Sequence, residues 1–505
     1  MAVMAPKSTK STDFHDRELL QRVRPHGWTN PVPKPLYDLV VVGGGPAGLA
    51  AAEWAMRLGL RVALVERHRL GGDSLNTGTI PSKAIIRTAG VRAIMPRAEE
   101  FGAPPSHDVA VDFQTAMARM RRIRSRIAEY HSADRLRTKG ADVFFGTAHF
   151  AASDALTVGD ARLRFKKALV ATGSQPQRST IPGLEEAGYL TSETIFELAA
   201  LPKRLTIIGG GPLGCEAAQA FSRLGTHVTL VQNEPKFLPH EERDASQLLS
   251  FALARDGVDT RLNTMILGVR VKNGVKILDT ANDAARYQID ADEIVLSIGR
   301  TPNVADLGLQ AAGIAFDPRT GIVVDDFLRT TNPRIYAAGD VCMPLRFTNA
   351  AEATARMAVQ NAFAAKRRRL SLMTIPWCTY CDPEIAHVGM HVWDASERSV
   401  PVKSFTVMMQ DVARAITDGQ DDGFVKIHVK LGTDKILGAT IVASRASEMI
   451  NEISVAMSTG IGMRKLAQVL HTYPAQSDAI RLAALAYTLD EPVSWLQRAY
   501  ARWLA

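Results

Sequence analysis

The chain contains the same short pattern twice, and this repetition constrains its fold more than any other feature of the sequence. In the first copy, the apolar run at 39–42 leads into GGGPAG at 43–48 and then into an alanine-rich segment. In the second copy, the apolar run at 205–208 leads into GGGPLG at 209–214. A buried strand, a G-x-G-x-x-G turn and a helix within about 30 residues are typical of a βαβ unit that binds a dinucleotide. The two copies therefore predict two dinucleotide ligands.

The glycines of each turn have separate physical roles. The first allows a tight turn, the second lets the backbone approach a pyrophosphate, and the third permits close packing of helix on strand. The first N–H groups of the helix and its dipole then favour the bound phosphates. The glycines expected to serve the two ligands are Gly43, Gly45, Gly48, Gly209, Gly211 and Gly214. The pattern predicts an α/β fold with two Rossmann-like domains.

The residue at the end of the second strand distinguishes the two units. Glu66 ends that strand in the first unit and is placed to hydrogen-bond a ribose hydroxyl. Gln232 has the matching position in the second unit. Its amide does not repel a 2′-phosphate, and the nearby Lys236 could help to bind one, but Gln232 is not an arginine that would grip it. The sequence leaves NADH and NADPH both open and favours NADPH slightly.

The composition excludes several classes of protein. The chain has 505 residues, enough for about three domains, and its four cysteines do not make a secreted disulfide framework. It shows no signal-peptide core and no run long enough to span a bilayer, so we expect a cytoplasmic protein without integral membrane association. The formal charge of +8 is spread along the chain, and no nucleic-acid partner is expected.

The two ends of the chain differ from the repeated units. Residues 1–36 are predicted to form an N-terminal arm, polar and disordered to about residue 14 and then, because of its prolines, extended along the body. From about residue 371 the pattern changes to alternating strands followed by helices, which indicates a further domain. The last stretch, 494–504, is amphipathic at helical period, so a packed or dimer-covering helix is favoured over contact with a membrane surface.

A segment that follows the first βαβ unit connects the chain with a known family. Residues 71–83, GGDSLNTGTIPSK, resemble the redox-disulfide segment GG-x-C-x-N-x-G-C-x-P-S-K of the flavin-dependent disulfide reductases. Further matching motifs are ATGS at 171–174, GRTPN at 299–303, YAAGD at 336–340, PWCTYCDPEIAHVG at 376–389 and HTYP at 471–474. Jointly, these motifs resemble the pyridine nucleotide–disulfide oxidoreductase family, and within it the mercuric reductase-like proteins.

The resemblance implies an architecture and two cofactors. The cofactors are FAD and NAD(P)H. The architecture is an FAD-binding domain in two parts, an NAD(P)-binding domain inserted between them, and a C-terminal α+β dimerisation domain that makes a homodimer. The implied boundaries are 37–175 and 301–370 for the FAD-binding domain, 176–300 for the NAD(P)-binding domain and 371–505 for the dimerisation domain.

The resemblance also implies roles for individual residues. Lys83 would lie beside flavin N5, where its ammonium group stabilises negative charge on the reduced ring. Glu216 would pair with Lys83 beside the nicotinamide, and Asp340 would hydrogen-bond the ribityl chain. The other positions implied to contact the cofactors are Gly72, Ser74, Ala148, Thr172, Gly173, Gly299, Arg300 and Ala350, together with Glu66, Gln232 and the six turn glycines.

Two residues depart from the family pattern where its electron transfer depends on cysteine. Ser74 and Thr79 stand where the two redox cysteines are expected. A pair of hydroxyls has no accessible redox couple, so it cannot take up two electrons as a disulfide does. We therefore expect the usual route of electrons out of the flavin to be missing.

The acceptor side differs at a second place. Where the family typically has His-Pro-Thr-x-x-Glu, residues 473–478 read YPAQSD, so Tyr473 and Asp478 replace the histidine and the glutamate. A tyrosine, with an ordinary pKa of about 10, is a hydrogen-bond donor or acid at neutral pH rather than a base. Asp478 is one methylene shorter than glutamate, and His471 is expected to point elsewhere. The candidate catalytic residues are Lys83, Glu216, Ser74, Thr79, Tyr473 and Asp478.

Cys378 and Cys381 offer an alternative redox pair that we do not favour. The segment has the pattern of a strand entry, and on a regular strand residues three apart point to opposite faces, where a disulfide cannot close. We expect a structural role for both cysteines. No second pair of ligands follows at zinc-site spacing, and no metal site is predicted.

These observations predict an FAD-dependent NAD(P)H oxidoreductase that lacks the redox disulfide. Hydride would pass from NAD(P)H to the flavin and then directly to a small acceptor, which could be a quinone, oxygen, a second nicotinamide nucleotide or an organic substrate, rather than to a disulfide or Hg(II). The alternative is a catalytically altered pseudoenzyme that binds FAD and nucleotide and acts as a sensor or assembly partner. Natural divergence is favoured over engineering, because threonine is not the usual replacement for cysteine.

Overall fold

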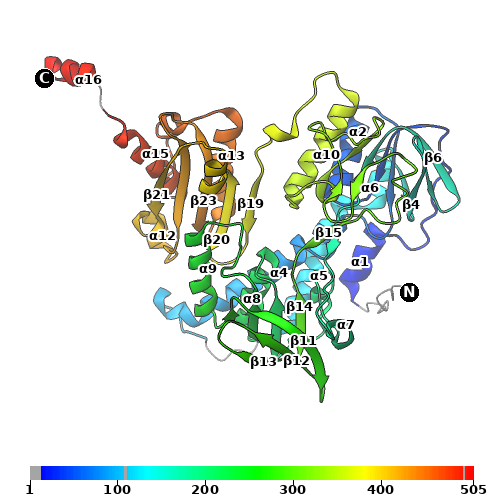
Figure 1. Cartoon of the computed structure of the whole chain (residues 1–505), viewed down its shortest axis with the longest axis horizontal. Helices are drawn as coiled ribbons and strands as arrows, with labels where there is room; N and C mark the ends of the chain where they lie inside the picture. The colour runs from blue at the N-terminus through cyan, green and yellow to red at the C-terminus, as the bar shows by residue number, and fades with distance from the viewer. Residues whose placement is uncertain (1–12, 107–110, 493–494) are drawn as a thin grey trace. The chain divides into compact units, whose positions relative to one another are not determined.

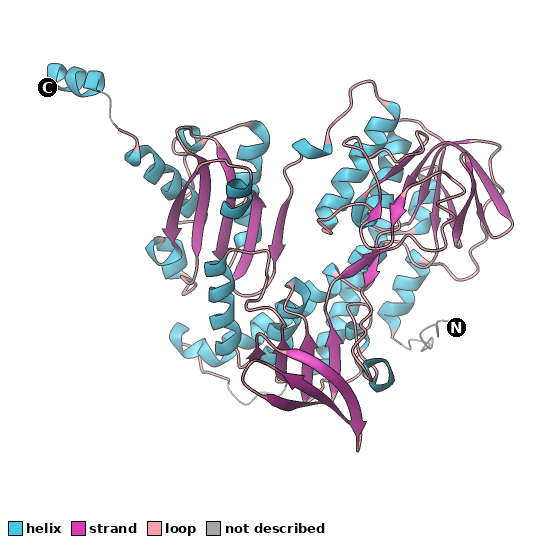
Figure 2. Cartoon of the chain, viewed as in Figure 1, coloured by secondary structure: helices cyan, strands magenta, loops and turns pink. Residues whose placement is uncertain are grey.

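The computed structural model describes residues 13–106, 111–492 and 495–505, and the chain forms two compact units (Figures 1 and 2). The first unit comprises Met1–Asn233 and Gly257–Leu372, and the second comprises Glu234–Asp256 and Met373–Ala505. Residues 1–12, predicted to be disordered, lie outside the described residues. The limits of these two units differ from the boundaries implied for the FAD-binding and NAD(P)-binding domains, so those domain boundaries remain a prediction.

The first βαβ unit is part of a seven-stranded sheet. β1 (Tyr37–Val42) pairs in parallel with β2 (Val62–Glu66) on one side and with β6 (Ala161–Val170) on the other, and β18 (Ile335–Ala337) pairs in parallel with β6. β1 and β2 are almost entirely buried, which explains the apolar runs at 39–42 and 62–65. The sheet also contains β3 (Asp142–Phe145), β4 (Ala148–Ala152) and β5 (Ala155–Val158).

Two helices with many small residues pack together beside this sheet. α2 (Pro46–Arg57) follows the first glycine turn, and its Ala51, Ala52 and Ala55 are fully buried. It contacts α10 (Thr348–Phe363), which comes from a much later part of the chain, and Figure 1 shows the two helices side by side. Small side chains allow this close approach, and the approach brings the start of α10 into the first βαβ unit.

The second βαβ unit has a smaller sheet of its own. β8 (Arg204–Ile208) pairs in parallel with β9 (His227–Val231) and with β14 (Glu293–Leu296), and α8 (Pro212–Arg223) follows its glycine turn. The other strands near it are β10 (Asp259–Arg261) and the antiparallel meander β11 (Met265–Lys272), β12 (Val275–Ala281) and β13 (Arg286–Ala291). Two short antiparallel pairs complete the first compact unit. They are β7 (Ser174–Pro176) with β15 (Arg300–Pro302), and β16 (Phe316–Asp317) with β17 (Gly321–Ile322), whose side chains join the core of the seven-stranded sheet. These sheets and helices confirm the predicted α/β fold class.

The segment 71–83 forms two consecutive helices, α3 (Gly72–Asn76) and α4 (Thr79–Ile94). α4 packs on α5 (Phe113–Ala128) and on α8 of the second βαβ unit. The segment that resembles the redox-disulfide motif therefore connects the first βαβ unit, which it follows in the chain, with the helix of the second βαβ unit. Both βαβ units belong to the first compact unit.

The N-terminal arm differs from the prediction, because it begins with helix α1 (Phe14–Val23) rather than an extended segment. Asp13 caps the helix by accepting hydrogen bonds from two N–H groups of its first turn. Leu19 and Val23, one turn apart, are buried. The prolines that suggested extended structure begin only at Pro25, after the helix has ended.

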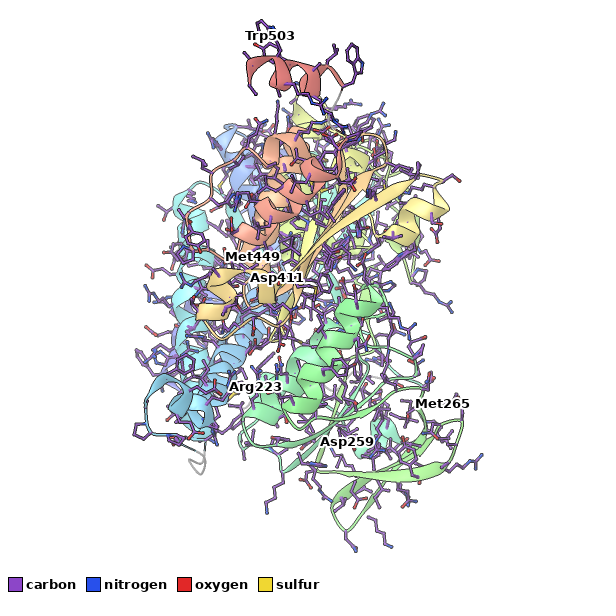
Figure 3. The ribbon with its side chains drawn as sticks, turned by 90° about the vertical axis from the view of Figure 1, so that its left-hand side faces the viewer. Arg223, Asp259, Met265, Asp411, Met449 and Trp503 are labelled. Carbon is purple, nitrogen blue, oxygen red and sulfur yellow. The ribbon has the colours of Figure 1, made fainter. Side chains whose placement is uncertain are left out.

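The second unit is built on a five-stranded antiparallel sheet in the order β19-β20-β23-β22-β21. Helices α13 (Ala446–Thr459) and α15 (Asp478–Asp490) pack on it around one apolar core, which includes Met449 of α13 (Figure 3). The strands are β19 (Pro376–Thr379), β20 (Glu384–Gly389), β21 (Val402–Met408), β22 (Phe424–Lys430) and β23 (Ile436–Ala443). This arrangement confirms the α+β class predicted for the C-terminal part.

The last helix, α16 (Trp495–Leu504), confirms the helix predicted for the C-terminal stretch. Its Trp495 and Trp503 are 74% and 78% exposed (Figure 3 labels Trp503). In the described part of the chain, no helix is long and apolar enough to cross a membrane. The remaining α-helices are α6 (Ala133–Thr138), α7 (Leu184–Ala187), α9 (Arg243–Arg255), α11 (Val392–Glu397), α12 (Ala413–Thr417) and α14 (Met463–Leu466).

A buried ion pair in the second unit yields a first prediction. Lys426 Nζ lies 2.7 Å from Glu242 Oε2, and the side chains are 16% and 7% exposed. Burial acts to raise the pKa of Glu242, but the adjacent His428 and Lys426 outweigh it and lower the pKa to about 2. Lys426→Met is expected to destabilise the protein by about 3 kcal/mol, because it leaves a buried carboxylate without this cation. Melting temperatures of wild type and variant measure the loss.

The matched control is an exposed ion pair of the same unit. Lys403 Nζ lies 2.5 Å from Asp490 Oδ2, with side chains 45% and 48% exposed. Lys403→Met is expected to cost less than about 1 kcal/mol, because water already screens the pair. Equal shifts in melting temperature for the two methionine variants would contradict the assignment of stability to burial.

Candidate functional site

The two glycine turns have nearly the same backbone geometry. Gly43 has a φ angle of 108° and Gly209 one of 106°, values that side chains disfavour. A Cβ atom on Gly48 would lie 1.7 Å from the carbonyl oxygen of Gly43, and one on Gly214 would lie 1.9 Å from that of Gly209. The first and third glycines of each turn are therefore required by the fold itself.

The middle glycines are not required by the fold in this way. A Cβ atom on Gly211 would meet none of the neighbouring described atoms within 4 Å, and one on Gly45 would lie at an ordinary 3.6 Å from a Cα atom. Each stands as the N-cap of a helix, α2 or α8, where backbone N–H groups lack partners inside the helix and favour an anion. The open approach and the oriented N–H groups fit the pyrophosphate of a dinucleotide at both turns.

The side chains that end the second strands brace these turns. Glu66 Oε2 accepts a hydrogen bond from the N–H of Gly44 at 2.7 Å, and Gln232 Oε1 accepts one from the N–H of Gly210 at 3.0 Å. Burial raises the pKa of Glu66, and two backbone N–H groups that donate to its carboxylate oppose this effect. The two βαβ units therefore share this hydrogen bond from the strand-end side chain to the glycine turn. The ribose contacts of both residues remain a prediction.

Lys83 and Glu216 form an ion pair. Lys83 Nζ donates to Glu216 Oε2 at 2.7 Å, and the side chains are 30% and 6% exposed. Lys83 lies near the start of α4 and Glu216 on α8, so the contact joins the segment 71–83 to the helix of the second glycine turn. A buried carboxylate is costly unless it is paired, so the pair fixes both side chains. The ion pair therefore fixes the Lys83 side chain at a partly exposed position.

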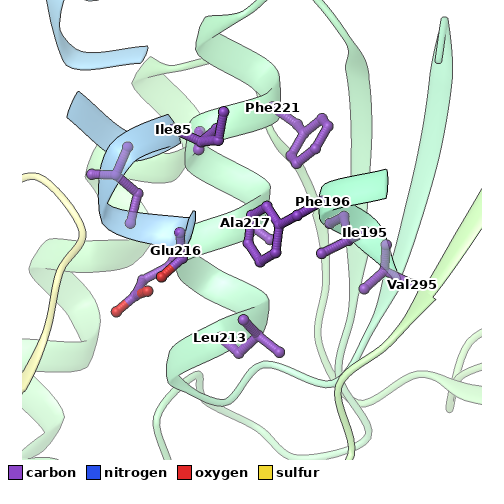
Figure 4. A pocket seen from close by; sticks show the side chains of 11 residues that line it. Ile85, Ile195, Phe196, Leu213, Glu216, Ala217, Phe221 and Val295 are labelled. Carbon is purple, nitrogen blue, oxygen red and sulfur yellow. The ribbon is translucent and has the colours of Figure 1, made fainter. Parts of the chain in front are cut away.

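An apolar pocket lies beside this ion pair (Figure 4). Its volume is about 350 Å³, including space open to solvent. Glu216 is the charged residue of its lining, and apolar walls with few polar groups are typical of sites for small molecules. The lining residues are Ser82, Ile85, Ile86, Ile195, Phe196, Leu213, Glu216, Ala217, Ala220, Phe221 and Val295.

Ser74 and Thr79 come from consecutive helices and share a third hydroxyl group between them. Thr348 Oγ1 lies 3.2 Å from Ser74 Oγ and 3.5 Å from Thr79 Oγ1. Thr348 is the first residue of α10, 274 and 269 residues further along the chain. Sequence reasoning missed it, because a single threonine before an alanine-rich helix carries no local signal. The three hydroxyls form a cluster that can donate and accept hydrogen bonds.

A chain of polar contacts joins Asp340 to the segment 71–83. Ser174 Oγ donates to Asp340 Oδ2 at 2.6 Å, and Arg300 Nε donates to Ser174 Oγ at 2.7 Å. The guanidinium of Arg300 also lies 3.1 Å from Asp73 Oδ2. Asp340 and Arg300 were predicted as site residues, whereas Ser174 and Asp73, which connect them to the segment, were not singled out.

The other predicted cofactor positions are explained by backbone geometry and packing. A Cβ atom on Gly72 would lie 2.7 Å from a Cα atom of the first glycine turn, and Gly299 has a φ angle of 120°. Thr172 Oγ1 donates to the carbonyl of Asn303 at 2.8 Å. Cofactor contact remains a prediction for these positions and for the last three, which are Gly173 with a φ angle of 69° and the buried Ala148 and Ala350.

In the second unit, the predicted acceptor-side residues are not gathered into one site within a single chain. Tyr473 is 78% exposed. The Asp478 carboxylate accepts hydrogen bonds from Arg481 at 2.6 and 3.1 Å. His471 Nε2 lies 2.9 Å from Glu452 Oε1, so this histidine is engaged elsewhere, as expected.

Two alternatives raised by the sequence also lie in the second unit. Lys236, considered for a 2′-phosphate, donates from Nζ to the carbonyl of Glu241 at 2.5 Å and lies 5.6 Å from the centre of the Trp393 ring. Cys378 lies on β19 and Cys381 lies beyond its end, and both are thiols. The strand position agrees with the structural role expected for Cys378.

Comparison with known proteins assigns these features to one family. Residues 37–365 match the model of the pyridine nucleotide-disulphide oxidoreductases, and residues 375–484 match that of their dimerisation domain. The chain belongs to the pyridine nucleotide-disulphide oxidoreductase family. The resemblance drawn from its motifs is thereby confirmed, and so is the FAD- and NAD(P)H-dependent flavoprotein class that it implied.

The chain is similar to family members that are named for different substrates. Mercuric reductase from Streptomyces lividans is 33% identical over 460 residues, which cover 90% of this chain and 97% of that protein. Dihydrolipoyl dehydrogenase from Thermus scotoductus is 31% identical over 454 residues, which cover 89% and 97%. Among solved structures, the HOCl-induced flavoprotein disulfide reductase RclA from Escherichia coli has a TM-score of 0.79 at 27% identity and covers 90% of this chain and 100% of that chain.

Proposed function

We propose that this member of the family is an FAD-dependent NAD(P)H oxidoreductase that works without a redox disulfide and passes electrons directly to a small acceptor. The observation that carries the proposal is the hydroxyl cluster of Ser74, Thr79 and Thr348, formed where the family pattern has two cysteines. No hydroxyl can take up the electron pair that a disulfide accepts. The Lys83–Glu216 pair on the nucleotide side is complete, by contrast.

The two glycine turns would divide the cofactors between them. The first turn with Glu66 would hold FAD, and the second turn with Gln232 would hold NAD(P)H, with each pyrophosphate at the N-terminus of α2 or α8. FAD, when bound, supplies a centre that accepts hydride from NAD(P)H and passes on two electrons. Asp340, which accepts a hydrogen bond from Ser174, would also hydrogen-bond a ribityl hydroxyl. The nicotinamide ring would lie beside the Lys83–Glu216 pair.

Lys83 would act through its fixed charge. Glu216 holds the ammonium group at 2.7 Å, so the cation does not need to be reoriented when negative charge develops nearby. Its side chain is 30% exposed, so a ligand could approach it. Glu216 is buried and holds Lys83, so it serves as a positioning residue.

The acceptor class follows from the hydroxyl cluster. Ser74, Thr79 and Thr348 supply donors and acceptors of hydrogen bonds but no group that is a base at neutral pH. Such a set can orient the oxygen of a carbonyl or an alcohol. We therefore place quinones and other carbonyl compounds first, ahead of oxygen and a second nicotinamide nucleotide.

We also infer a homodimer, because residues 375–484 match the dimerisation domain of the family. Tyr473, which is 78% exposed in one chain, would then complete the site of the other subunit as a hydrogen-bond donor. Asp478, fixed by Arg481, would position the turn that carries Tyr473. The cytoplasm, expected from the small number of cysteines, is part of the same proposal.

Anaerobic stopped-flow mixing of the purified yellow protein with NADPH or NADH tests the proposal. We expect NADPH to bleach the flavin, and a quinone to reoxidise it at least about tenfold faster than lipoamide or Hg(II), the acceptor types for which the dihydrolipoyl dehydrogenase and mercuric reductase relatives are named. If neither nucleotide bleaches the flavin, the protein is the altered pseudoenzyme. If a disulfide reoxidises the flavin as fast as a quinone does, the loss of the redox disulfide has been misread.

Alanine at the hydroxyl positions is expected to affect only the second half of the reaction. Ser74→Ala, Thr79→Ala or Thr348→Ala should leave reduction of the flavin by NADPH within about threefold of wild type. Each should slow reoxidation by a quinone about tenfold, because a hydrogen bond made to the acceptor is lost. Thr88→Ala is the control, since Thr88 lies further along α4 and donates to the carbonyl of Ala84. A large loss in the first half-reaction would contradict this division.

A further inference from the structure

A cluster of buried side chains in the second unit has no part in the function proposed above. Glu241, His387 and His391 each present one ligand-type atom, and these atoms lie within 4.8 Å of one another. The three residues are only 4%, 0% and 4% exposed. Glu241 precedes α9, His387 lies on β20 and His391 is the N-cap of α11, which follows β20 directly, so two distant segments of the chain meet here.

Several polar atoms of the cluster lack partners. Both ring nitrogens of His391 and the Oε2 atom of Glu241 are buried and make no hydrogen bond to any described residue. Burying such atoms unpaired is costly, and native proteins keep them mainly where a ligand, an ion or a water pairs them. An imidazole nitrogen and a carboxylate oxygen both carry lone pairs, so one electron-pair acceptor at the centre would satisfy both.

Hydrogen bonds from neighbouring residues orient two of the three side chains, Glu241 and His387. Trp377 Nε1 donates to Glu241 Oε1 at 2.7 Å and leaves Oε2 facing the cluster. The ring nitrogens of His387 lie 2.9 Å from Thr440 Oγ1 and 3.2 Å from the carbonyl oxygen of Gly389. A metal-ligating histidine typically keeps one outer hydrogen bond, which fixes its ring while the other nitrogen binds the ion. Both nitrogens of His387 have partners here, so one of these two contacts must break when the ion binds.

We propose that Glu241, His387 and His391 bind a divalent transition-metal ion, for which Zn²⁺ is the probe. Two imidazoles and one carboxylate are a ligand set that zinc accepts, with a fourth position left for water. Magnesium and calcium prefer oxygen ligands only, so this donor set does not suit them. The site is independent of the proposed redox activity, because none of its residues serves the flavin or the nucleotide.

Binding requires a small rearrangement. Tetrahedral zinc with bonds of about 2.0–2.1 Å places its ligand atoms about 3.3 Å apart, closer than the present limit of 4.8 Å. The rings of His387 and His391 are stacked at 3.5 Å between centres, and His391 also stacks on Trp393 at 4.2 Å. Because an imidazole directs its lone pair within its own plane, the two stacked rings must tilt to share one ion.

Charged groups of both signs surround the cluster. Lys236 donates to the backbone carbonyl of Glu241, and its positive charge opposes a cation. Glu242, 2.8 Å from His428 and also paired with Lys426, and Asp394, whose carboxylate accepts from the N–H of His391, add negative charge. A bound dication would therefore face a mixed environment, with the carboxylate of Glu241 as its direct counter-charge. Its physical effect would be to join the segment before α9 to β20 and α11.

The test is metal content of the FAD-loaded protein. After treatment with EDTA, the protein is incubated with excess Zn²⁺, passed over a desalting column and measured by mass spectrometry of the metal. We expect about one zinc per chain in wild type and less than about 0.2 in Glu241→Gln and in His391→Ala. Zn²⁺ should also raise the melting temperature of wild type but not of Glu241→Gln, because only a bound ligand stabilises the folded state.

The controls separate this site from other zinc ligands of the same unit. His471→Gln removes a histidine that also faces a glutamate, Glu452, and should keep about one zinc. Cys378→Ser and Cys381→Ser should keep it as well. Glu241→Gln retains the size of the side chain and the oxygen that accepts from Trp377, so it covers the case in which His391→Ala does not fold. The proposal is overturned if wild type holds no zinc, if zinc persists in Glu241→Gln, or if a serine variant removes it.

Discussion

Replacing Lys83 with methionine is expected to slow the reduction of the bound flavin by NADPH by about 10²-fold or more. Lys83 Nζ is held 2.7 Å from Glu216 Oε2, and the methionine variant removes this fixed cation while keeping a side chain of similar length. Loss of one preorganised charge at a reacting centre typically costs about 10²–10³ in rate. Anaerobic stopped-flow absorbance of the flavin band measures this half-reaction alone.

Two further variants separate charge from shape. Lys83→Arg keeps the positive charge, although its planar fork fits a single carboxylate oxygen differently, and should lose less than about tenfold. Glu216→Gln keeps the shape of the positioning partner but weakens its hold on the ammonium group, so an intermediate rate is expected. Flavin content and melting temperature show whether each variant is folded and loaded. A Lys83→Met protein with full flavin content and a reduction rate within threefold of wild type would refute the role of Lys83.

Alanine substitutions in the second glycine turn are expected to separate folding from nucleotide binding. Gly214→Ala would place a Cβ atom 1.9 Å from the carbonyl oxygen of Gly209. Because backbone must move to relieve this overlap, we expect a loss of about 3 kcal/mol, seen as a melting temperature lowered by several degrees. Gly211→Ala adds the same methyl group where no neighbouring described atom lies within 4 Å. Its melting temperature should stay near that of wild type.

The same Gly211→Ala protein should bind NADPH poorly. Its methyl group would occupy the open approach to the N-terminus of α8, where the pyrophosphate is expected. We expect the KM for NADPH to rise at least about tenfold while the flavin content is unchanged, since Gly45 of the first turn is untouched. An unchanged KM together with a normal melting temperature would show that the second turn does not hold the nucleotide.

The parts of the site that could be predicted from sequence are those set by short-range geometry. The spacing of Gly209, Gly211 and Gly214 indicates a turn whose backbone must come close to its own helix, and the structure shows the contacts that demand it. The N-terminal helix shows the limit of such reasoning. Its signals, Asp13 as a cap and an apolar pair one turn apart, were present but were outweighed by the prolines that follow the helix.

Other parts of the site depend on contacts between distant segments, for which local spacing carries no signal. Thr348 reaches Ser74 across 274 residues because α10 packs on α2. Ser174 and Asp73 lie in different segments, and the side chain of Arg300 brings them into one network. The pairing of Lys83 with Glu216 was expected only from the family resemblance, and its geometry came from the packing of α4 on α8.

Residue identity and local spacing were enough to predict two glycine turns of the dinucleotide-binding type, the family and the loss of cysteine at positions 74 and 79. Each of these depends on residue identity or on spacing within about 30 residues, which local backbone geometry translates directly into structure. The folded chain, in contrast, was needed to show that a third hydroxyl, from Thr348, joins Ser74 and Thr79, and that Glu241, His387 and His391 meet in one buried cluster. Such meetings depend on how whole helices and strands pack, because packing, unlike a turn, brings together residues that have no fixed separation along the chain.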